Sequence, residues 1–442
     1  MSIANGAVSL SERLPLPSVE GMVILSAMTI RANDWGVATC LASGAQKERV
    51  HSTTAATTQA AYLDYNASTP LDPRVAEVMV SALMNVGNAT SAHGFGRQQA
   101  ALVDCSREQV AALVGSRPSN VVFTASATEA NNLAICGAVQ AASQDQFRIL
   151  VSAVEHASVF RTADWLRARG AVRVDVIPVT SGGFVDLGAV ERLLGPDVLL
   201  VSVMAANGET GVVNPIMEVA ELAHASGSLF HCDATQFVGR IPLSMDDVGI
   251  DLVSVSGHKL GGPMGVGALI GTRQALGQLT PVIHGGGHER GLRSGSLNVP
   301  GIIGFGEAAT LAVEARAEES IRLAKLRDLL TARLIAAVPG VVQIGDVERR
   351  LPNTACLRFR GADAEAVTVN LEPVAVSAGS ACSVGSIEPS HVLLAMGLSR
   401  SAAFECVRFS LGRSNVDTDI EFAVSRAVQA VGYVRTMTAE AV

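Results

Sequence analysis

From Tyr62 onward the sequence alternates short apolar runs with longer helical stretches, and this alternation constrains the fold more than any other feature. The clearest apolar runs are residues 148–152, 198–203, 228–232 and 251–255. Short buried strands that alternate with helices indicate an α/β fold, a mainly parallel sheet with helices on both faces. Because sites in such folds gather beyond the carboxyl ends of the strands, the polar residues that end or follow these runs are the candidates for chemistry.

The composition indicates a folded protein and excludes some classes of binding partner. Hydrophobic residues make up 48% of the 442 residues and charged residues 17%, which is ample for a packed core. The formal net charge of -8 gives no electrostatic reason to expect a nucleic acid or an anionic membrane as the main partner. No apolar run reaches about 18 residues, so we expect no transmembrane helix.

The cysteines and histidines predict neither a disulfide framework nor a metal site. The seven cysteines are an odd number without a C-x-x-C pair, and no Cys/His cluster has zinc spacing. Three glycines separate His284 from His288 and disfavour the helix that would bring both rings to one face. A reducing compartment is the simplest interpretation, so we expect a cytoplasmic protein, with an organelle as the alternative.

Residues 1–61 differ from the rest of the chain. They end in a tract of small residues and carry as many acidic as basic side chains, unlike an arginine-rich transit peptide. We expect a poorly ordered extension that is atypical of the remaining chain. Further on, a long helical pattern at residues 307–338 stops at the breaker pair Pro339-Gly340, and this helix could bridge two domains.

Two charged residues near strand ends suggest a cofactor with an aldehyde and a pyridine ring. Lys259 lies between a predicted buried strand and a glycine turn, where partial desolvation lowers a lysine pKa and favours imine formation. Asp233 ends the preceding strand, and a carboxylate there can keep the pyridine nitrogen of pyridoxal phosphate protonated. An ordinary surface lysine and a helix-capping aspartate are the alternatives.

His156 and the segment 123–132 could complete such a site. His156 ends another strand, where its imidazole could stack on a flat ring and handle protons, or could serve the structure alone. In 123–132 a strand leads into a helix start around Thr128, whose free N–H groups could bind a phosphate. Ser256 and His258 could add donors, and a capped helix start that binds nothing is the alternative.

Two residues of the C-terminal part could act on a substrate. Cys382 lies in a loop of small residues, 377–386, that leaves its thiol uncovered, whereas structural cysteines lie in apolar runs. Arg408 interrupts an apolar strand, and a buried guanidinium needs an anion. A substrate carboxylate taken bidentately would supply the anion, and an internal salt bridge is the competing interpretation.

From Tyr62 to about Val434 the chain resembles the cysteine desulfurases, pyridoxal-phosphate enzymes of the class V aminotransferase group with the fold-type I architecture. The order and spacing of several motifs carry the resemblance: residues 62–70, the segments around Thr128, His156, Asp233 and Lys259, residues 284–291 with 293–296, and the Cys382 loop. The segment 382–393 is similar to the subgroup that serves nitrogen fixation and iron–sulfur assembly.

The resemblance implies a homodimer in which each subunit has two domains. The large domain, residues 76–318, would hold a mainly parallel seven-stranded sheet flanked by helices. The smaller α+β domain would combine residues 62–75 with 319–442 and carry the Cys382 loop.

The resemblance also implies a role for each candidate residue toward pyridoxal 5'-phosphate. Lys259 would form the imine and then shuttle protons, Asp233 would pair with the pyridine nitrogen, and His156 would stack on the ring. Gln236 would bind the phenolic oxygen. The phosphate would be held by Thr128, Ser256 and His258, with Ser296 from the second subunit.

The implied reaction starts from free L-cysteine and releases L-alanine. Arg408 would bind the substrate carboxylate, and the Cys382 thiolate would attack the substrate sulfur and keep it as a persulfide. The persulfide would then pass to a protein acceptor, an iron–sulfur scaffold or a thiolation enzyme.

One position departs from the family pattern. The family usually carries two asparagines where this sequence has Asn207 and Gly208, and the second would hydrogen-bond the cofactor oxygen and the substrate carboxylate. Losing such a contact costs roughly 1.5–3 kcal/mol. The Asn207 side chain could take over this contact and bind the substrate, or a water molecule could occupy the place of the missing side chain at position 208.

Other functions are carried as alternatives to the desulfurase. A selenocysteine lyase, or another class V lyase or transaminase, would share the cofactor site, although a transaminase needs no thiol such as Cys382. An activity-weakened homologue that acts as a binding partner is the non-enzyme alternative, and Gly208 motivates it.

Overall fold

The computed structural model describes residues 59–142, 147–378, 381–383 and 386–440. The N-terminal extension that we expect at residues 1–61 therefore lies outside the described residues, apart from its last three. No helix within the described ranges is long and apolar enough to cross a membrane.

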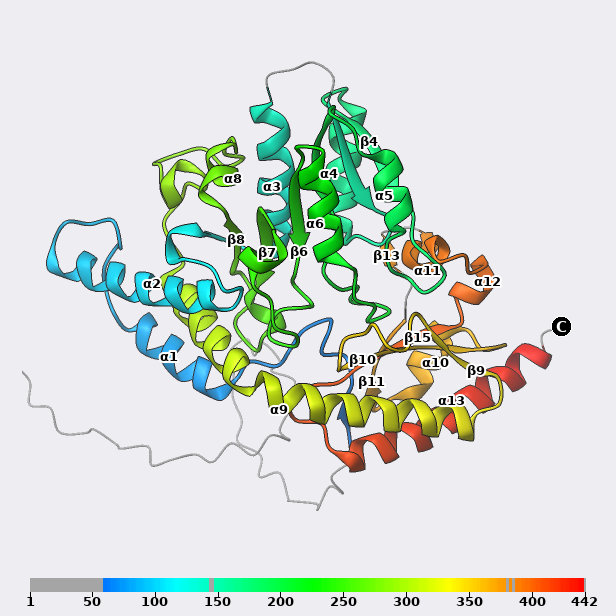
Figure 1. Cartoon of the computed structure of the whole chain (residues 1–442). Helices are drawn as coiled ribbons and strands as arrows, with labels where there is room; N and C mark the ends of the chain where they lie inside the picture. The colour runs from blue at the N-terminus through cyan, green and yellow to red at the C-terminus, as the bar shows by residue number, and fades with distance from the viewer. Residues whose placement is uncertain (1–58, 143–146, 379–380, 384–385, 441–442) are drawn as a thin grey trace, which may run out of the picture. The chain divides into compact units, whose positions relative to one another are not determined.

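The central sheet has seven strands, and β8 is the single one that runs against the others (Figure 1). In spatial order the strands are β2 (Val121–Thr124), β8 (Gly267–Gly271), β7 (Leu252–Ser256), β6 (Leu229–Asp233), β5 (Val198–Ser202), β3 (Arg148–Ser152) and β4 (Arg173–Ile177). The four apolar runs of the sequence form β3, β5, β6 and β7. The predicted mainly parallel, seven-stranded α/β sheet is therefore confirmed.

Alternate residues of the strands enter two hydrophobic cores on opposite faces of this sheet. In β3, Leu150 packs into one core, whereas Ile149 and Val151 pack into the other. Side chains alternate across a strand, so strands with two buried faces read as continuous apolar runs.

Each core is completed by its own set of helices. The core around Leu150 takes residues from α2 (Gly94–Ala112), α5 (Leu187–Leu193), α6 (Ile216–Ala225) and α7 (Met245–Val248). The opposite core takes residues from α3 (Ala127–Ala141), α4 (Ala157–Ala168) and α8 (Arg273–Gly277).

A second, antiparallel sheet is built from the C-terminal part of the chain. Its order is β12 (Ser377–Ala378), β15 (Cys406–Ser410), β10 (Thr354–Phe359) and β9 (Val341–Ile344). It shares a third core with α10 (Ala364–Leu371) and α13 (Asp417–Glu440). The N-terminal strand β1 (Ala61–Tyr62) joins this region by pairing with β11 (Val374–Ala375). A smaller α+β part therefore accompanies the large sheet.

One long helix, α9 (Val299–Ala337), belongs to both parts (Figure 1). Its first half places Ile302 and Phe305 in the core around Leu150, and its second half places Leu330 in the core of the small sheet. The boundary that we predict between residues 318 and 319 falls inside this continuous helix, and the division into two domains stays a prediction.

The remaining elements are short. They are α1 (Pro73–Leu83), α11 (His391–Ala395), α12 (Arg400–Ala403), the hairpin of β13 (Ala381–Ser383) and β14 (Ser386–Glu388), and the 3-10 helices η1 (Pro118–Asn120), η2 (Gly257–Lys259) and η3 (Glu289–Gly291). The backbone of Cys382 lies in β13 and pairs with Ile387.

Candidate active site

A cavity of about 490 Å³ lies beyond the carboxyl ends of the parallel strands. Nine of the predicted site residues line it: Thr128, His156, Asn207, Asp233, Gln236, Ser256, His258, Lys259 and Arg408. Ser296 is exposed and does not line the cavity, and the side chain of Cys382 lies outside the described part of the structure. Lys259, Asp233 and His156, which were selected because they end or follow predicted strands, therefore do lie at one cavity.

Lys259 ends η2, directly after β7, and its amine points to the N-terminal segment of the described chain. The Nζ atom donates to the backbone carbonyls of Asn66, at 2.6 Å, and Ala67, at 2.7 Å. Burial, followed by the nearby cations Arg408 and Arg240, lowers the pKa of the amine to about 8. A usable fraction of the amine is therefore neutral near neutral pH, and the neutral form is the one that attacks a carbonyl carbon.

Asp233 ends β6 and is held by uncharged donors. Its Oδ2 accepts from Nδ2 of Asn131 at 2.8 Å, and its Oδ1 accepts from the backbone N–H of Thr235 at 3.0 Å. Because neither donor carries a net charge, the negative charge of the carboxylate remains to stabilise a cationic group in the cavity.

His156 is the N-cap of α4, and this contact defines its tautomer. Its Nδ1 accepts from the backbone N–H of Ser158 at 3.1 Å and lies 2.8 Å from the Ser158 hydroxyl. In the neutral ring the proton is then on Nε2. The preceding Glu155 is fully buried, and burial raises the pKa of its carboxyl to about 8.

The residues predicted to hold a phosphate lie on two elements. Thr128 is in the first turn of α3, which Ser126 caps by accepting from Glu129 N–H at 3.2 Å. A helix start with free N–H groups favours an anion. Ser256 Oγ lies 3.2 Å from Nδ1 of His258, and burial together with the adjacent Lys259 lowers the pKa of His258 to about 4.

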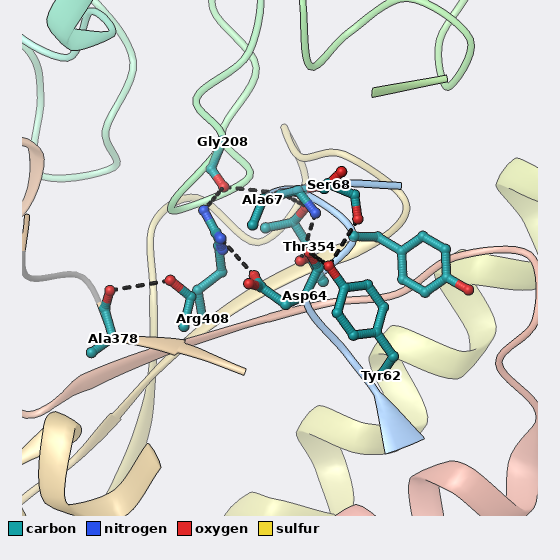
Figure 2. A network of polar contacts seen from close by, with 12 residues as sticks. Tyr62, Asp64, Ala67, Ser68, Gly208, Thr354, Ala378 and Arg408 are labelled. Atoms are coloured by element: carbon teal, nitrogen blue, oxygen red, sulfur yellow. Dashed lines mark hydrogen bonds and ion pairs between the residues drawn. The ribbon is translucent and has the colours of Figure 1, made fainter. Parts of the chain in front are cut away.

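Arg408 reaches the cavity from β15 and bridges two groups, as Figure 2 shows. Its Nη2 lies 2.7 Å from Oδ1 of Asp64, and its Nη1 donates to the carbonyl of Gly208 at 3.2 Å. The internal salt bridge that we weighed against a substrate carboxylate thus exists. The Nε atom is nevertheless buried without a partner among the described residues, so one N–H of the guanidinium remains for an anion.

Unpartnered buried polar atoms concentrate at this cavity. Of nine such side-chain atoms in the described residues, six belong to cavity-lining residues: Asn131, Glu155, Glu209, Thr235, Gln236 and Arg408. A buried donor or acceptor without a partner costs about 1–3 kcal/mol, so six of them in one place indicate a polar ligand. Together with an aldehyde-reactive amine and a strand-end carboxylate, the set fits pyridoxal 5'-phosphate.

Asn207 and Gly208 lie at the cavity in different roles. The Asn207 amide donates to the carbonyl of Val154 at 3.0 Å and accepts from the N–H groups of Glu209 and Thr210, both at 2.9 Å. These bonds hold its own loop and leave the amide little freedom to move toward position 208. A Cβ at Gly208 would lie 3.1 Å from Cγ of Gln236, so the Gln236 side chain occupies the neighbouring space.

The structure also brings to the site three residues for which the sequence predicts no role: Asp64, Asn66 and Glu209. Asp64 and Asn66 belong to the recognised motif at residues 62–70, but their partners are a distant arginine and backbone groups. Glu209 directly follows Gly208, and burial raises its pKa to about 7. The only local feature of the sequence that pointed to Glu209 is its place next to position 208, where this sequence differs from the family pattern.

Comparison with known families agrees with the fold and the site. The model of the family described as aminotransferase class-V matches residues 61–422. A NifS-like protein from Rickettsia africae has a similar structure, with a TM-score of 0.77, 34% identity, and coverage of 85% of this chain and 100% of the other. A structure of DndA from Streptomyces lividans has a TM-score of 0.67 and 36% identity over 80% of this chain and 98% of the other.

Curated relatives narrow the class. A cysteine desulfurase of a Frankia species is 46% identical over 387 residues, which cover 85% of this chain and 92% of the relative. Cysteine desulfurase IscS of Anaeromyxobacter dehalogenans is 40% identical over 379 residues, or 85% of this chain and 94% of the relative. The chain therefore belongs to the aminotransferase class-V family, and within it to the cysteine desulfurases.

Proposed function

We propose that this cysteine desulfurase binds pyridoxal 5'-phosphate in the cavity and converts free L-cysteine into L-alanine and a persulfide on Cys382. The observation that carries the proposal is the group of unpartnered polar atoms gathered around the Lys259 amine and the Asp233 carboxylate. When bound, the cofactor supplies a conjugated ring that accepts an electron pair from the substrate carbon.

The residues of the cavity would hold the cofactor at its three polar ends. Asp233 would face the ring nitrogen, Gln236 the phenolic oxygen, and His156 the flat face. The phosphate would be bound by the start of α3 at Thr128 and by Ser256 and His258. A neutral His258 can donate a hydrogen bond there without changing the charge.

Lys259 and Arg408 would act on the amino acid. The depressed pKa of Lys259 lets its amine accept a proton from the substrate and return it near neutral pH. Arg408 would bind the substrate carboxylate through Nε, while Asp64 keeps hold of Nη2.

Cys382 would take the sulfur. Its thiolate attacks the substrate sulfur, the carbon–sulfur bond breaks, and the bonding electron pair stays on the carbon, which is then protonated to give L-alanine. The sulfur is left as a Cys382 persulfide, and a protein acceptor, an iron–sulfur scaffold or a thiolation enzyme, receives it. The backbone of Cys382 lies in β13, which pairs with β14, and β14 ends at Glu388, two residues before the cavity-lining Ser390; this position supports the assignment.

A homodimer completes the proposal. Exposed apolar side chains occur on and just after α1 and at the start of α2, namely Val80, Leu83, Met84, Val86 and Phe95. Ser296 is exposed and lies outside the cavity of its own chain, which supports its assignment to the phosphate site of the second subunit. A two-domain subunit with a large domain at 76–318, and a cytoplasmic location, remain part of the proposal.

The test is the reaction itself. Purified protein loaded with pyridoxal 5'-phosphate should release L-alanine from L-cysteine and form a persulfide on Cys382, detected by mass spectrometry. Cys382→Ser should keep the cofactor absorbance and form no persulfide, whereas Lys259→Ala should lose that absorbance. Loaded wild-type protein that yields no alanine would instead favour the weakened homologue.

A further inference from the structure

Asn66 has no role in the reaction proposed above, yet it contacts several groups of the site. It is almost fully buried, with 1% of its surface exposed. Its backbone carbonyl accepts from Lys259 Nζ at 2.6 Å and from Gln236 Nε2 at 3.0 Å. Its side-chain Nδ2 donates to the carbonyl of Gly208 at 2.9 Å and to Thr354 Oγ1 at 2.8 Å.

The Gly208 carbonyl connects Asn66 to Arg408. A carbonyl oxygen has two lone pairs, and here one accepts from Asn66 Nδ2 and the other from Arg408 Nη1 at 3.2 Å. Figure 2 shows Arg408 lying between this carbonyl and the Asp64 carboxylate. The guanidinium is therefore held through both Nη atoms, and only its Nε atom has no partner among the described residues.

The glycine at position 208 explains why this arrangement matters in this chain. A side chain there would meet Gln236, whose Cγ and Nε2 both lie 3.1 Å from the position of a Cβ. Position 208 thus contributes a backbone carbonyl to the site and no side chain. Position 208 can therefore orient Arg408 only through its backbone carbonyl, and the Asn66 side chain holds this carbonyl in place by a hydrogen bond.

We propose that Asn66 is a positioning residue for the substrate carboxylate: its amide holds the Gly208 carbonyl, which in turn holds the Arg408 guanidinium at the cavity. The inference rests on the proposed function, because it concerns the carboxylate of the same amino acid. The Asn66 side chain acts through Gly208 and Arg408, so its effect depends on a ligand that has a carboxylate.

The decisive variant is Asn66→Asp, which exchanges the Nδ2 donor for an oxygen and keeps the backbone carbonyl that receives Lys259. The ligands are L-alanine, the reaction product, and L-alaninamide, which lacks the carboxylate. Their dissociation constants are measured from the absorbance change of cofactor-loaded protein. We expect L-alanine to bind about tenfold or more weakly, because a hydrogen-bonded charge contact is disturbed, and L-alaninamide to bind as in the wild type.

Two controls separate positioning from general damage. Thr354→Val removes the other acceptor of the same Nδ2 without touching Gly208, and should leave L-alanine affinity within about twofold. In an Arg408→Met background, Asn66→Asp should cause no further loss, because the two residues act on one contact. Should Asn66→Asp not fold, Asn66→Ser, whose side chain is too short to reach the Gly208 carbonyl, must give the same selective loss.

Three results would overturn the inference: an equal loss for both ligands, a loss that persists without Arg408, or a Thr354→Val variant as impaired as Asn66→Asp. Failure of the proposed function looks different. In that case the wild-type protein itself neither binds L-alanine nor releases it from L-cysteine.

Discussion

Burial shifts the pKa of several side chains in the cavity toward the neutral form. It lowers the pKa of Lys259 to about 8 and that of His258 to about 4, and it raises the pKa of Glu209 to about 7. In each case desolvation disfavours the charged form. A larger fraction of each of these groups is therefore neutral than its residue type alone would give.

The Lys259 shift predicts how cofactor binding depends on pH. Only the neutral amine attacks the aldehyde, so the rate of reconstitution of the apoprotein should rise with pH and level off above about 8. The absorbance change on mixing with pyridoxal 5'-phosphate measures this rate. The sequence has just two other lysines, Lys47 and Lys325, and Lys259→Ala gives their background. A midpoint near the ordinary lysine value of about 10.4 would contradict the prediction.

At position 208, the structure predicts that restoring the usual asparagine does not help. A Gly208→Asn side chain would push Gln236 from its place and break its 3.0 Å bond to the Asn66 carbonyl. Loss of a neutral hydrogen bond costs about 0.5–1.5 kcal/mol, so kcat/KM for L-cysteine should fall roughly two- to tenfold. Gly432→Asn is the matched control, because no atom of the described residues beyond its own helix turns lies within 4 Å of the position that a Cβ would take at this exposed glycine. A gain in kcat/KM for Gly208→Asn would refute this view.

Among the elements, η3 depends on one buried carboxylate. Glu289 and Arg290 have φ values of 46° and 59°, in the left-handed region that residues other than glycine rarely adopt. Glu289 accepts from both Nη atoms of Arg107, at 2.8 Å and 2.7 Å, and from Phe123 N–H at 2.7 Å. These contacts tie the turn to α2 and β2 and stabilise its unusual backbone.

Removing this carboxylate should be costly. Glu289→Ala leaves the Arg107 charge unpaired in a mostly buried position, so the free energy of unfolding should fall by about 3–5 kcal/mol, measured by urea denaturation. Asp164→Ala breaks the exposed pair with Arg167 and should cost less than about 1 kcal/mol. Equal costs for the two variants would show that the Glu289 contacts do not stabilise the fold.

For the whole described part of the molecule, α9 joins two cores that would otherwise be separate. Leu330 is fully buried in the small-sheet core, and Leu330→Ala should cost about 2–5 kcal/mol. Because the helix continues into the core around Leu150, amide exchange should accelerate in β6 as well as in β10. Ile321→Ala, on the exposed side of α9, is the control and should change neither the free energy of unfolding nor the amide exchange of β6 and β10. Faster exchange confined to β10 would mean that the two parts unfold independently.

The sequence predicted the main sheet and the location of most candidate site residues because both depend on local patterns. A strand buried on both faces needs a continuous apolar run, and a residue that follows such a run must lie at the sheet edge. Lys259, Asp233 and His156 could be selected on that basis. The ends of α9 and its membership in two cores were harder to predict from the sequence, because burial of a long helix depends on what packs against it.

Residue types and their order along the chain were sufficient to predict the α/β sheet and to select Lys259 and Cys382 as candidates for the chemistry. The tertiary structure decided what surrounds them: Asp64 on Arg408, and the carbonyls of Asn66 and Gly208 on Lys259 and Arg408. Every residue has a backbone carbonyl, so no residue type marks the ones that become ligands. They acquire that role only when folding brings a segment near the N-terminus of the described chain against strands encoded far away in the sequence.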